Sequence, residues 1–251
     1  MKSAPFRWLE TVRGGALGLV YPRVCVGCDL PLEANGELWL CENCKPDLKP
    51  IEPPYCDTCG QPYEGRMAQG FRCSNCSDLD LAFDFAVGAY RAEGLARELI
   101  HRFKYEKQHF LCALLGELLR DALNDPRLRD ARDDDWLLTP VPLHPRRLRE
   151  REFNQAAELC RTFRRGEWRF EYGEVLKRTR YTRRQANLDR ADRLTNLEGA
   201  FSMKRSGGVS GRPVLLVDDV LTTGATASEC ARVLREEGGA AKVVVITVVR
   251  G

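Results

Sequence analysis

The fold is decided by residues 214–226, which read Val-Leu-Leu-Val-Asp-Asp-Val-Leu-Thr-Thr-Gly-Ala-Thr. Four apolar residues at 214–217 predict a buried strand, and the adjacent carboxylates Asp218 and Asp219 stand at its end. Small residues follow, and a helical pattern begins at Gly224. A strand that runs through a small-residue loop into a helix is typical of a parallel α/β sheet, in which ligands bind beyond the carboxyl ends of the strands.

The loop after this strand suits a phosphorylated sugar. Its five small residues are Thr222, Thr223, Gly224, Ala225 and Thr226. Their backbone N–H groups can surround a phosphate at the helix N-terminus, with the two carboxylates where ribose hydroxyls would lie. Alone, Asp-Asp is often a solvated turn and Thr-Thr-Gly an N-cap. The whole combination is more specific, and it resembles the phosphoribosyl pyrophosphate (PRPP) loop of the type I phosphoribosyltransferases.

The body of the chain alternates between strand and helix patterns. Strands are predicted at 82–90, 136–141, 214–217 and 242–249, and helices at 95–103, 110–123, 154–165 and 224–237. The polar stretch 124–135 is interpreted as a surface loop. We therefore expect a mostly parallel α/β sheet, with the loops after Val141, around Arg183 and after Val217 meeting at one edge.

Four Cys-x-x-Cys pairs precede this body: Cys25 and Cys28, Cys41 and Cys44, Cys56 and Cys59, and Cys73 and Cys76. Two such knuckles complete a tetrahedral four-cysteine zinc site, and four closed ligands make a structural site. Sequential pairing, giving two structural Zn²⁺ ions, is the simplest, although the near-equal gaps also permit another. Disulfides and iron–sulfur clusters are the weaker alternatives.

Charge separates the cysteine-rich part from the rest. Residues 1–80 contain 8 Lys/Arg and 11 Asp/Glu, whereas residues 141–193 contain 15 and 8. Two zinc sites made of four thiolates each would add further negative charge, so the ribbons are poor phosphate binders and suit docking of a protein partner. Anion binding is expected in 141–193, which could also follow single-stranded DNA, with Phe153 and Tyr181 stacking on bases.

Three basic segments are candidates to face the ligand. Arg146 and Arg147 lie between a strand end and a helix near Asn154, where guanidinium groups suit a pyrophosphate, although a solvated basic loop is the alternative. Residues 176–201 include Arg183 and Arg184 and are interpreted as a mobile cover or, alternatively, a solvated linker. Lys104, at a helix end, could reach an anion or simply favour the helix dipole.

These segments, in this order behind the cysteine pairs, resemble the ComF family. The motifs are Phe103-Lys104-Tyr105, Val141-Pro142-Leu143, Phe153-Asn154-Gln155, Thr182 to Gln185, Asn196 with Ala200-Phe201, and residues 218–226. The family usually has Arg-Gly before Phe-Asn-Gln, whereas this chain has Arg151-Glu152. The resemblance implies an N-terminal double zinc ribbon, here 1–80, and a domain of the type I phosphoribosyltransferase kind, here 81–251.

The same resemblance implies a function. Asp218 and Asp219 would contact the ribose hydroxyls, residues 222–226 the 5′-phosphate, and Mg²⁺ would accompany the PRPP. Arg183 and Arg184 are assigned with the two carboxylates to catalysis, and Lys104, Arg146, Arg147, Asn154 and Gln155 to PRPP binding. The expected activity is transfer of ribose 5-phosphate from PRPP to an unknown acceptor. The alternative is a non-catalytic, PRPP-responsive protein that handles single-stranded DNA during natural transformation.

The N-terminal 21 residues are interpreted as an amphipathic helix, because their apolar part is short and has no Ala-x-Ala site. No apolar run approaches the ~20 residues of a membrane helix, so a cytoplasmic protein without a membrane partner is expected.

Overall fold

The computed structural model describes residues 23–32, 39–65, 70–77, 79–132, 135–163, 170–182, 197–204 and 208–251. Contacts divide the chain into two compact units, Met1–Leu48 and Lys49–Gly251. The second group of four cysteines, residues 56–76, therefore belongs to the same unit as the sheet. The boundary predicted at residue 80 was placed where the cysteine-rich sequence ends, which is after this group. The predicted N-terminal helix lies outside the described residues.

A five-stranded sheet forms the centre of the larger unit, and all its strands are parallel. Their order is β1 (Phe85–Arg91), β7 (Lys242–Arg250), β6 (Pro213–Leu221), β2 (Leu137–Pro140) and β3 (Glu171–Tyr172). Residues 243–249 of β7 are completely buried, because this Val/Ile-rich strand lies inside the sheet with both faces covered. The predicted mostly parallel α/β sheet is confirmed.

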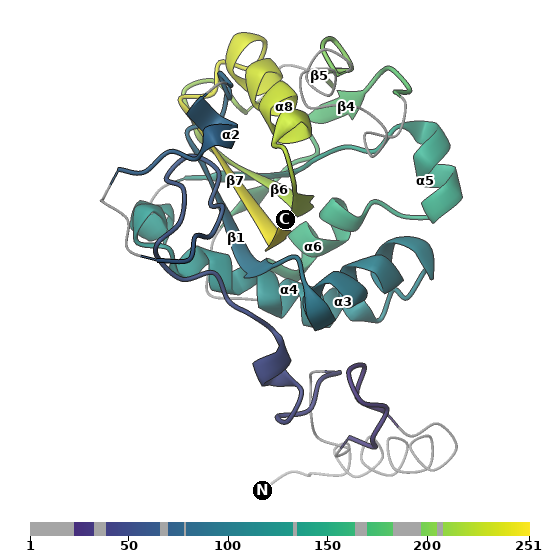
Figure 1. The fold of residues 1–251 in the computed structure, drawn as a ribbon. Coiled ribbons are helices and arrows are strands. Elements are labelled where there is room, and N and C mark those ends of the chain that lie inside the picture. The colour runs from purple at the N-terminus through teal and green to yellow at the C-terminus, as the bar shows by residue number, and fades with distance from the viewer. Residues whose placement is uncertain are drawn as a thin grey trace, which may run out of the picture. The chain divides into compact units, whose positions relative to one another are not determined.

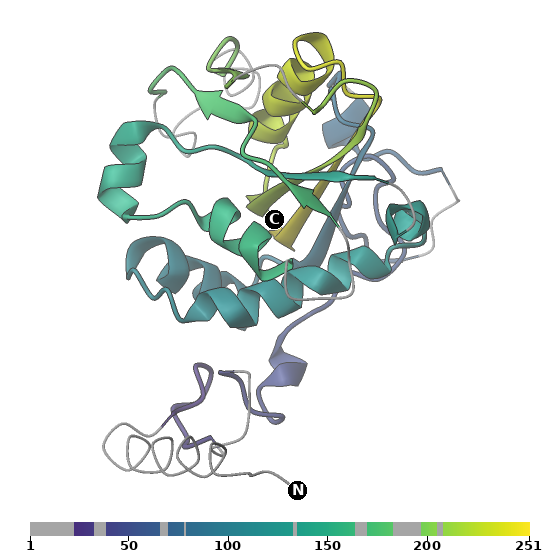
Figure 2. The ribbon, with the colours of Figure 1, turned by 180° about the vertical axis from the view of Figure 1, so that it is seen from behind.

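Helices cover both faces of the sheet (Figures 1 and 2). On one face lie α3 (Gly94–Tyr105), α4 (Leu111–Arg120) and α6 (Gln155–Phe163), and on the other lies α8 (Ala225–Glu236). The α8 face carries a continuous core that includes Val214, Leu216, Val233 and Leu234. Each helix presents a stripe of buried apolar residues to the sheet, as the 3.6-residue period of its sequence requires.

Two predictions about irregular segments were wrong. The expected surface loop 124–135 contains 3₁₀ turns over Asp121–Asn124 and Pro126–Arg132, and Leu128 is completely buried there. The expected basic loop after residue 142 forms α5 (Pro145–Arg151), for which Pro145 is a suitable first residue.

The base of the 176–201 segment is an antiparallel hairpin of β4 (Leu176–Arg178) and β5 (Phe201–Met203). Leu176, Leu197, Ala200 and Phe201 join the core on the α8 face. Their apolar side chains anchor the hairpin over the carboxyl end of the sheet. Arg183 and Arg184 lie outside the described residues.

The short elements of the cysteine-rich part are a 3₁₀ turn at Lys45–Asp47 and α2 at Ser74–Ser77. In the part of the chain that the structure describes, no helix has the length and apolar composition needed to cross a bilayer.

Candidate functional site

The eight cysteines gather into two clusters of four. Cys25, Cys28, Cys41 and Cys44 form one and Cys56, Cys59, Cys73 and Cys76 the other, with the sulfur atoms of each cluster within 4.8 Å of one another. The sequential pairing is therefore confirmed. Knuckle N–H groups point at the sulfurs, from Cys41 to Cys25 Sγ at 3.3 Å and from Cys73 to Cys56 Sγ at 3.3 Å. Such bonds favour thiolates, so both clusters fit structural zinc.

The second candidate site is an open pocket at the carboxyl end of the sheet, with a volume of about 190 Å³. Strand β6 continues through Leu221, so Asp218 and Asp219 are strand residues and not the beginning of the loop. Their side chains leave opposite faces of the strand. The loop 222–224 then leads into α8, and Gly224 has φ +81°, a left-handed conformation that favours glycine.

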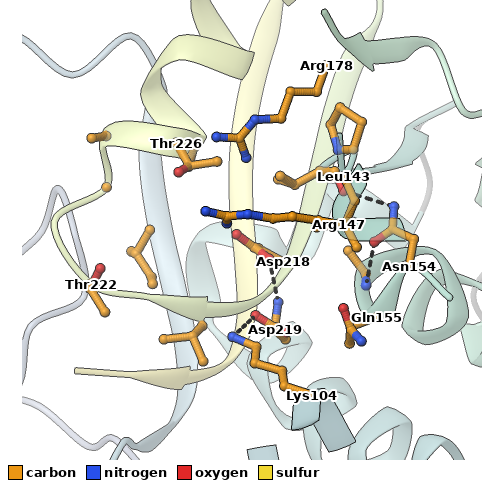
Figure 3. Close-up of a pocket in the computed structure, with 18 of the residues that line it drawn as sticks. Lys104, Leu143, Arg147, Asn154, Gln155, Arg178, Asp218, Asp219, Thr222 and Thr226 are labelled. Atoms are coloured by element: carbon orange, nitrogen blue, oxygen red, sulfur yellow. Dashed lines mark hydrogen bonds and ion pairs between the residues drawn. The ribbon is translucent and has the colours of Figure 1, made fainter. Parts of the chain in front are cut away.

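Four segments distant in sequence supply the pocket's polar groups, one of them β6 with the loop that follows it (Figure 3). Helix α3 provides Lys104, α5 provides Arg147 and Arg151, and β4 provides Arg178. Figure 3 shows the Arg147 and Arg178 side chains reaching toward the space between Asp218 and Thr226. The residues of the predicted site that line this pocket are Lys104, Arg147, Asn154, Gln155, Asp218, Asp219 and 222–226.

The two carboxylates have different environments. Asp219 is 4% exposed, and its Oδ1 lies 2.7 Å from Lys104 Nζ. Asp218 is only partly buried, and its Oδ1 accepts a hydrogen bond from the Asp219 N–H at 2.9 Å. Burial and the neighbouring Asp219 charge raise the pKa of Asp218 to about 7. Asp218 is therefore the carboxylate that faces the open pocket and is poised to change charge near neutral pH.

Arg178 was not predicted from the sequence, although it is the most buried cation of the pocket. It is 9% exposed, its Nη2 donates to Thr182 Oγ1 at 2.5 Å, and it lies over the Phe201 ring. Burial, and then repulsion by Arg147, lower the pKa of Arg178 to about 10. Two mutually repelling guanidinium groups create a site that an anion would stabilise. Arg151, another arginine of the basic segment that follows β2, also lines the pocket, and its Nη1 donates to Gln155 Oε1 at 3.0 Å.

Asn154 connects two backbone segments that line the pocket. Its Nδ2 donates to the Val141 carbonyl at 3.1 Å, and its Oδ1 accepts from the Ala156 N–H at 3.2 Å. The side chain thus caps the start of α6 and ties it to the end of β2. Gln155 is 2% exposed, and its buried Nε2 has no hydrogen-bond partner among the residues that the structure describes.

Some predicted residues lie elsewhere. Arg146 does not line the pocket; its guanidinium lies over the Tyr181 ring, and its Nε is 3.4 Å from Glu150 Oε1. The predicted base-stacking role of Phe153 was wrong, because the ring is 6% exposed and packed between Phe103 and His109. Tyr181 is 41% exposed, so its ring is accessible for the predicted stacking on a base.

Comparison with known proteins agrees with this architecture. The chain is 34% identical to competence protein F of Haemophilus influenzae over 85% of its own length and 91% of the relative. The chain belongs to the ComF family. Residues 16–77 also match the family model described as a double zinc ribbon domain.

Another ComF relative is the DNA utilization protein YhgH of Escherichia coli K12. It is 30% identical to the chain over 89% of the chain and 95% of the relative. Among solved structures, a hypoxanthine phosphoribosyltransferase from Staphylococcus aureus covers 59% of the chain and 65% of its own, with a TM-score of 0.32 and 12% identity. A likeness at that level is no evidence for a ligand, so the ligand is inferred from the site itself.

Proposed function

We propose that this chain binds PRPP in the pocket at the carboxyl end of β6. The observation that carries the proposal is the gathering of one solvent-facing carboxylate, a small-residue loop at a helix N-terminus, and four cations around a single pocket. These are the groups that a ribose, a 5′-phosphate and a pyrophosphate require, in that order.

The loop 222–226 is placed to receive the 5′-phosphate. Helix α8 has 12 residues and begins at Ala225, so its first-turn N–H groups and the positive end of its dipole face the loop. Gly224, the N-cap residue, has φ +81°, a left-handed conformation that leads the chain from the strand into the helix. The Thr223 hydroxyl accepts from the Ala225 N–H at 3.4 Å and shapes the turn.

The two carboxylates have different roles in this proposal, and only Asp218 contacts the ribose. Asp218 faces the pocket and can accept hydrogen bonds from the ribose hydroxyls when deprotonated. Asp219 forms an ion pair with Lys104 and so keeps the ammonium group at the pocket wall. In this arrangement Arg147 and Arg178 hold the pyrophosphate, and the favourable pairing offsets their mutual repulsion.

The same residues could also support transfer of the ribose 5-phosphate group. If transfer occurs, Arg147 and Arg178 stabilise the charge that develops on the departing pyrophosphate, while the pocket walls limit water around C1. Mg²⁺ bound with PRPP would neutralise part of the phosphate charge, and Asp218 offers it an oxygen ligand. Among the described residues that line the pocket none is aromatic, so a stacking platform for a base acceptor is not provided there.

A second function, binding of single-stranded DNA, is favoured by two exposed tyrosines. Tyr105 and Tyr181 are 56% and 41% exposed. The Arg151 guanidinium lies 5.5 Å from the Tyr105 ring, and that of Arg146 lies 4.8 Å from the Tyr181 ring. Aromatic faces beside arginines suit stacked bases and a phosphate backbone. The names of the relatives, competence protein F and DNA utilization protein, point the same way.

Retention of radiolabelled PRPP on a filter, with single-stranded DNA as competitor, tests both functions. We expect saturable PRPP retention, and Tyr181→Ala should weaken DNA binding without changing PRPP retention. Release of pyrophosphate in the presence of a metabolite extract then tests for transfer. Absence of PRPP retention by the zinc-loaded chain would refute the first function, and unchanged DNA binding by Tyr105→Ala/Tyr181→Ala would refute the second.

A further inference from the structure

Arg250, at the end of β7, connects the second cysteine cluster to the pocket. Its side chain is buried, with only 2% of the residue exposed. The Nε donates to the Cys59 carbonyl at 2.8 Å, and Nη2 donates to Cys59 Sγ at 3.2 Å. The Nη1 donates to the Leu221 carbonyl at 3.1 Å and also contacts the Gly251 oxygen. One planar group therefore joins a cluster cysteine to the end of β6.

The buried positive charge of Arg250 requires negative charge nearby. Within the described residues, no Asp or Glu side chain forms an ion pair with it; its acceptors at Cys59 and Leu221 are formally neutral amide oxygens, and it also contacts the Gly251 oxygen. Burying an uncompensated guanidinium is strongly unfavourable. A cluster of four thiolates with Zn²⁺ carries a formal charge of −2, so Cys59 Sγ contributes negative charge to this buried guanidinium through a charge-assisted hydrogen bond.

The other end of the connection is the phosphate loop. Leu221 is the last residue of β6, and Thr222 follows it directly. Its carbonyl accepts from Arg250 Nη1 and also from the Gly251 N–H at 2.9 Å. These two bonds fix the position from which the loop 222–226 begins.

A second set of contacts reaches the far side of the same loop. Leu81 packs against the second cysteine cluster, and a Cβ at Gly224 would lie 3.8 Å from Leu81 and 3.5 Å from Phe83. The Ala82 N–H donates to Ser228 Oγ, in α8, at 3.0 Å. The short helix α2, which carries Cys76, lies near α8 in both ribbon views. The loop is thus supported by the cluster at both ends.

We infer that the Cys56/Cys59/Cys73/Cys76 site positions the phosphate loop, with Arg250 as the positioning residue, so that zinc in this site and an occupied loop stabilise each other. The part that concerns PRPP rests on the function proposed above. Coupling between two sites is reciprocal, so PRPP should raise the zinc affinity of the second site by the factor by which zinc raises the affinity for PRPP.

The test compares wild type with Arg250→Gln and Arg250→Lys as full-length, zinc-loaded chains. Hydrogen exchange of peptides that cover 221–226 reports on the loop, and chelator-accessible zinc reports on the metal sites. In Arg250→Gln we expect at least fivefold faster exchange in the loop and faster release of one of the two zinc ions. Arg250→Lys, which keeps the charge but not the planar fork, should restore slow zinc release in part.

Arg212→Gln is the matched control, because Arg212 pairs with Asp135 and Glu171 at the opposite end of β6. It should leave loop exchange and zinc release unchanged. If Arg250→Gln has wild-type loop exchange and wild-type zinc release, the inference is wrong. If Arg250→Gln does not fold, the same two measurements on Arg250→Lys decide.

PRPP titration adds a readout that separates the two proposals. The expected result is a tenfold weaker PRPP affinity in Arg250→Gln. If wild type binds no PRPP, the proposed function fails, whereas the exchange and zinc measurements still decide the role of Arg250. An Arg250→Gln variant that loses loop protection but binds PRPP as tightly as wild type would overturn the coupling.

Discussion

Lys104 Nζ lies 2.7 Å from Asp219 Oδ1, and the two side chains are only 17% and 6% exposed. The pair joins α3 to β6 directly beneath the pocket (Figure 3). Lys104 therefore compensates the buried charge of Asp219. Removal of one partner from such a buried ion pair leaves an uncompensated charge, which is strongly unfavourable.

Lys104→Met should lower the free energy of unfolding by about 3 kcal/mol, because Asp219 would lose its counter-charge. The double variant Lys104→Met/Asp219→Asn should recover most of that loss. Urea denaturation of the zinc-loaded chain measures both effects. Lys107→Met is the control, since Lys107 and Glu152 form an exposed pair whose loss costs under about 1 kcal/mol. Equal losses in the two single variants would contradict the assignment.

Asp218→Asn should stabilise the ligand-free protein in a pH-dependent way. The folded-state pKa of Asp218 is about 7, and the unfolded-state value is about 3.9. Ionisation is therefore unfavourable in the folded state, and its cost grows from about pH 4 to pH 7 and is constant above that. Each pKa unit corresponds to about 1.4 kcal/mol. Unfolding at pH 5, 6, 7 and 8 should show the advantage of the asparagine variant growing to pH 7; a constant difference would argue against the raised pKa.

Arg178→Met should have opposite effects on stability and on binding. The lowered pKa of Arg178 means that its positive charge is unfavourable in the folded protein, so replacement should raise stability by about 1 kcal/mol. It should also weaken PRPP binding at least tenfold, because the buried cation is lost. Thermal unfolding and PRPP titration measure the two effects. The control is the exposed Arg180, which donates to the Glu198 carbonyl; Arg180→Met should change neither quantity appreciably.

Glu152→Gly tests the departure from the family pattern. Glu152 has φ +70°, a left-handed conformation that glycine adopts without a Cβ penalty. The variant should be about 0.5–1 kcal/mol more stable, since the exposed ion pair with Lys107 contributes little. By contrast, Glu150→Gly lies within α5 and should be destabilising by a similar amount. A destabilised Glu152→Gly in chemical denaturation would mean that the Lys107 pair outweighs the backbone strain.

The sequence predicted those parts of the fold and site that are local in the chain. The buried strand, its two carboxylates and the loop 222–226 are contiguous, and each Cys-x-x-Cys pair predicts a metal-binding knuckle, with sequential pairing the simplest arrangement. The pocket's floor and its phosphate loop could therefore be placed before the structure was known.

The predictions that were wrong or incomplete concern residues whose positions depend on contacts between distant segments of the chain. Arg178 stands in Leu-Lys-Arg without a local signal, and only the pairing of β4 with β5 brings it to the pocket. Phe153 looked available for stacking, but α3 and His109 enclose it. Helix α5 did have a signal, namely His144 as N-cap before Pro145, which the run of arginines concealed.

Calorimetric titration of the zinc-loaded chain with Mg–PRPP tests the central claim most directly. The account predicts one PRPP per chain, binding that is tighter than for ribose 5-phosphate or pyrophosphate alone, and loss of binding in Asp218→Asn/Asp219→Asn. Asp29→Asn, a replacement of a cysteine-ribbon carboxylate, is the matched control and should titrate like wild type. Absence of binding by the wild-type chain with both zinc ions present, or unchanged binding by the double variant, would contradict it.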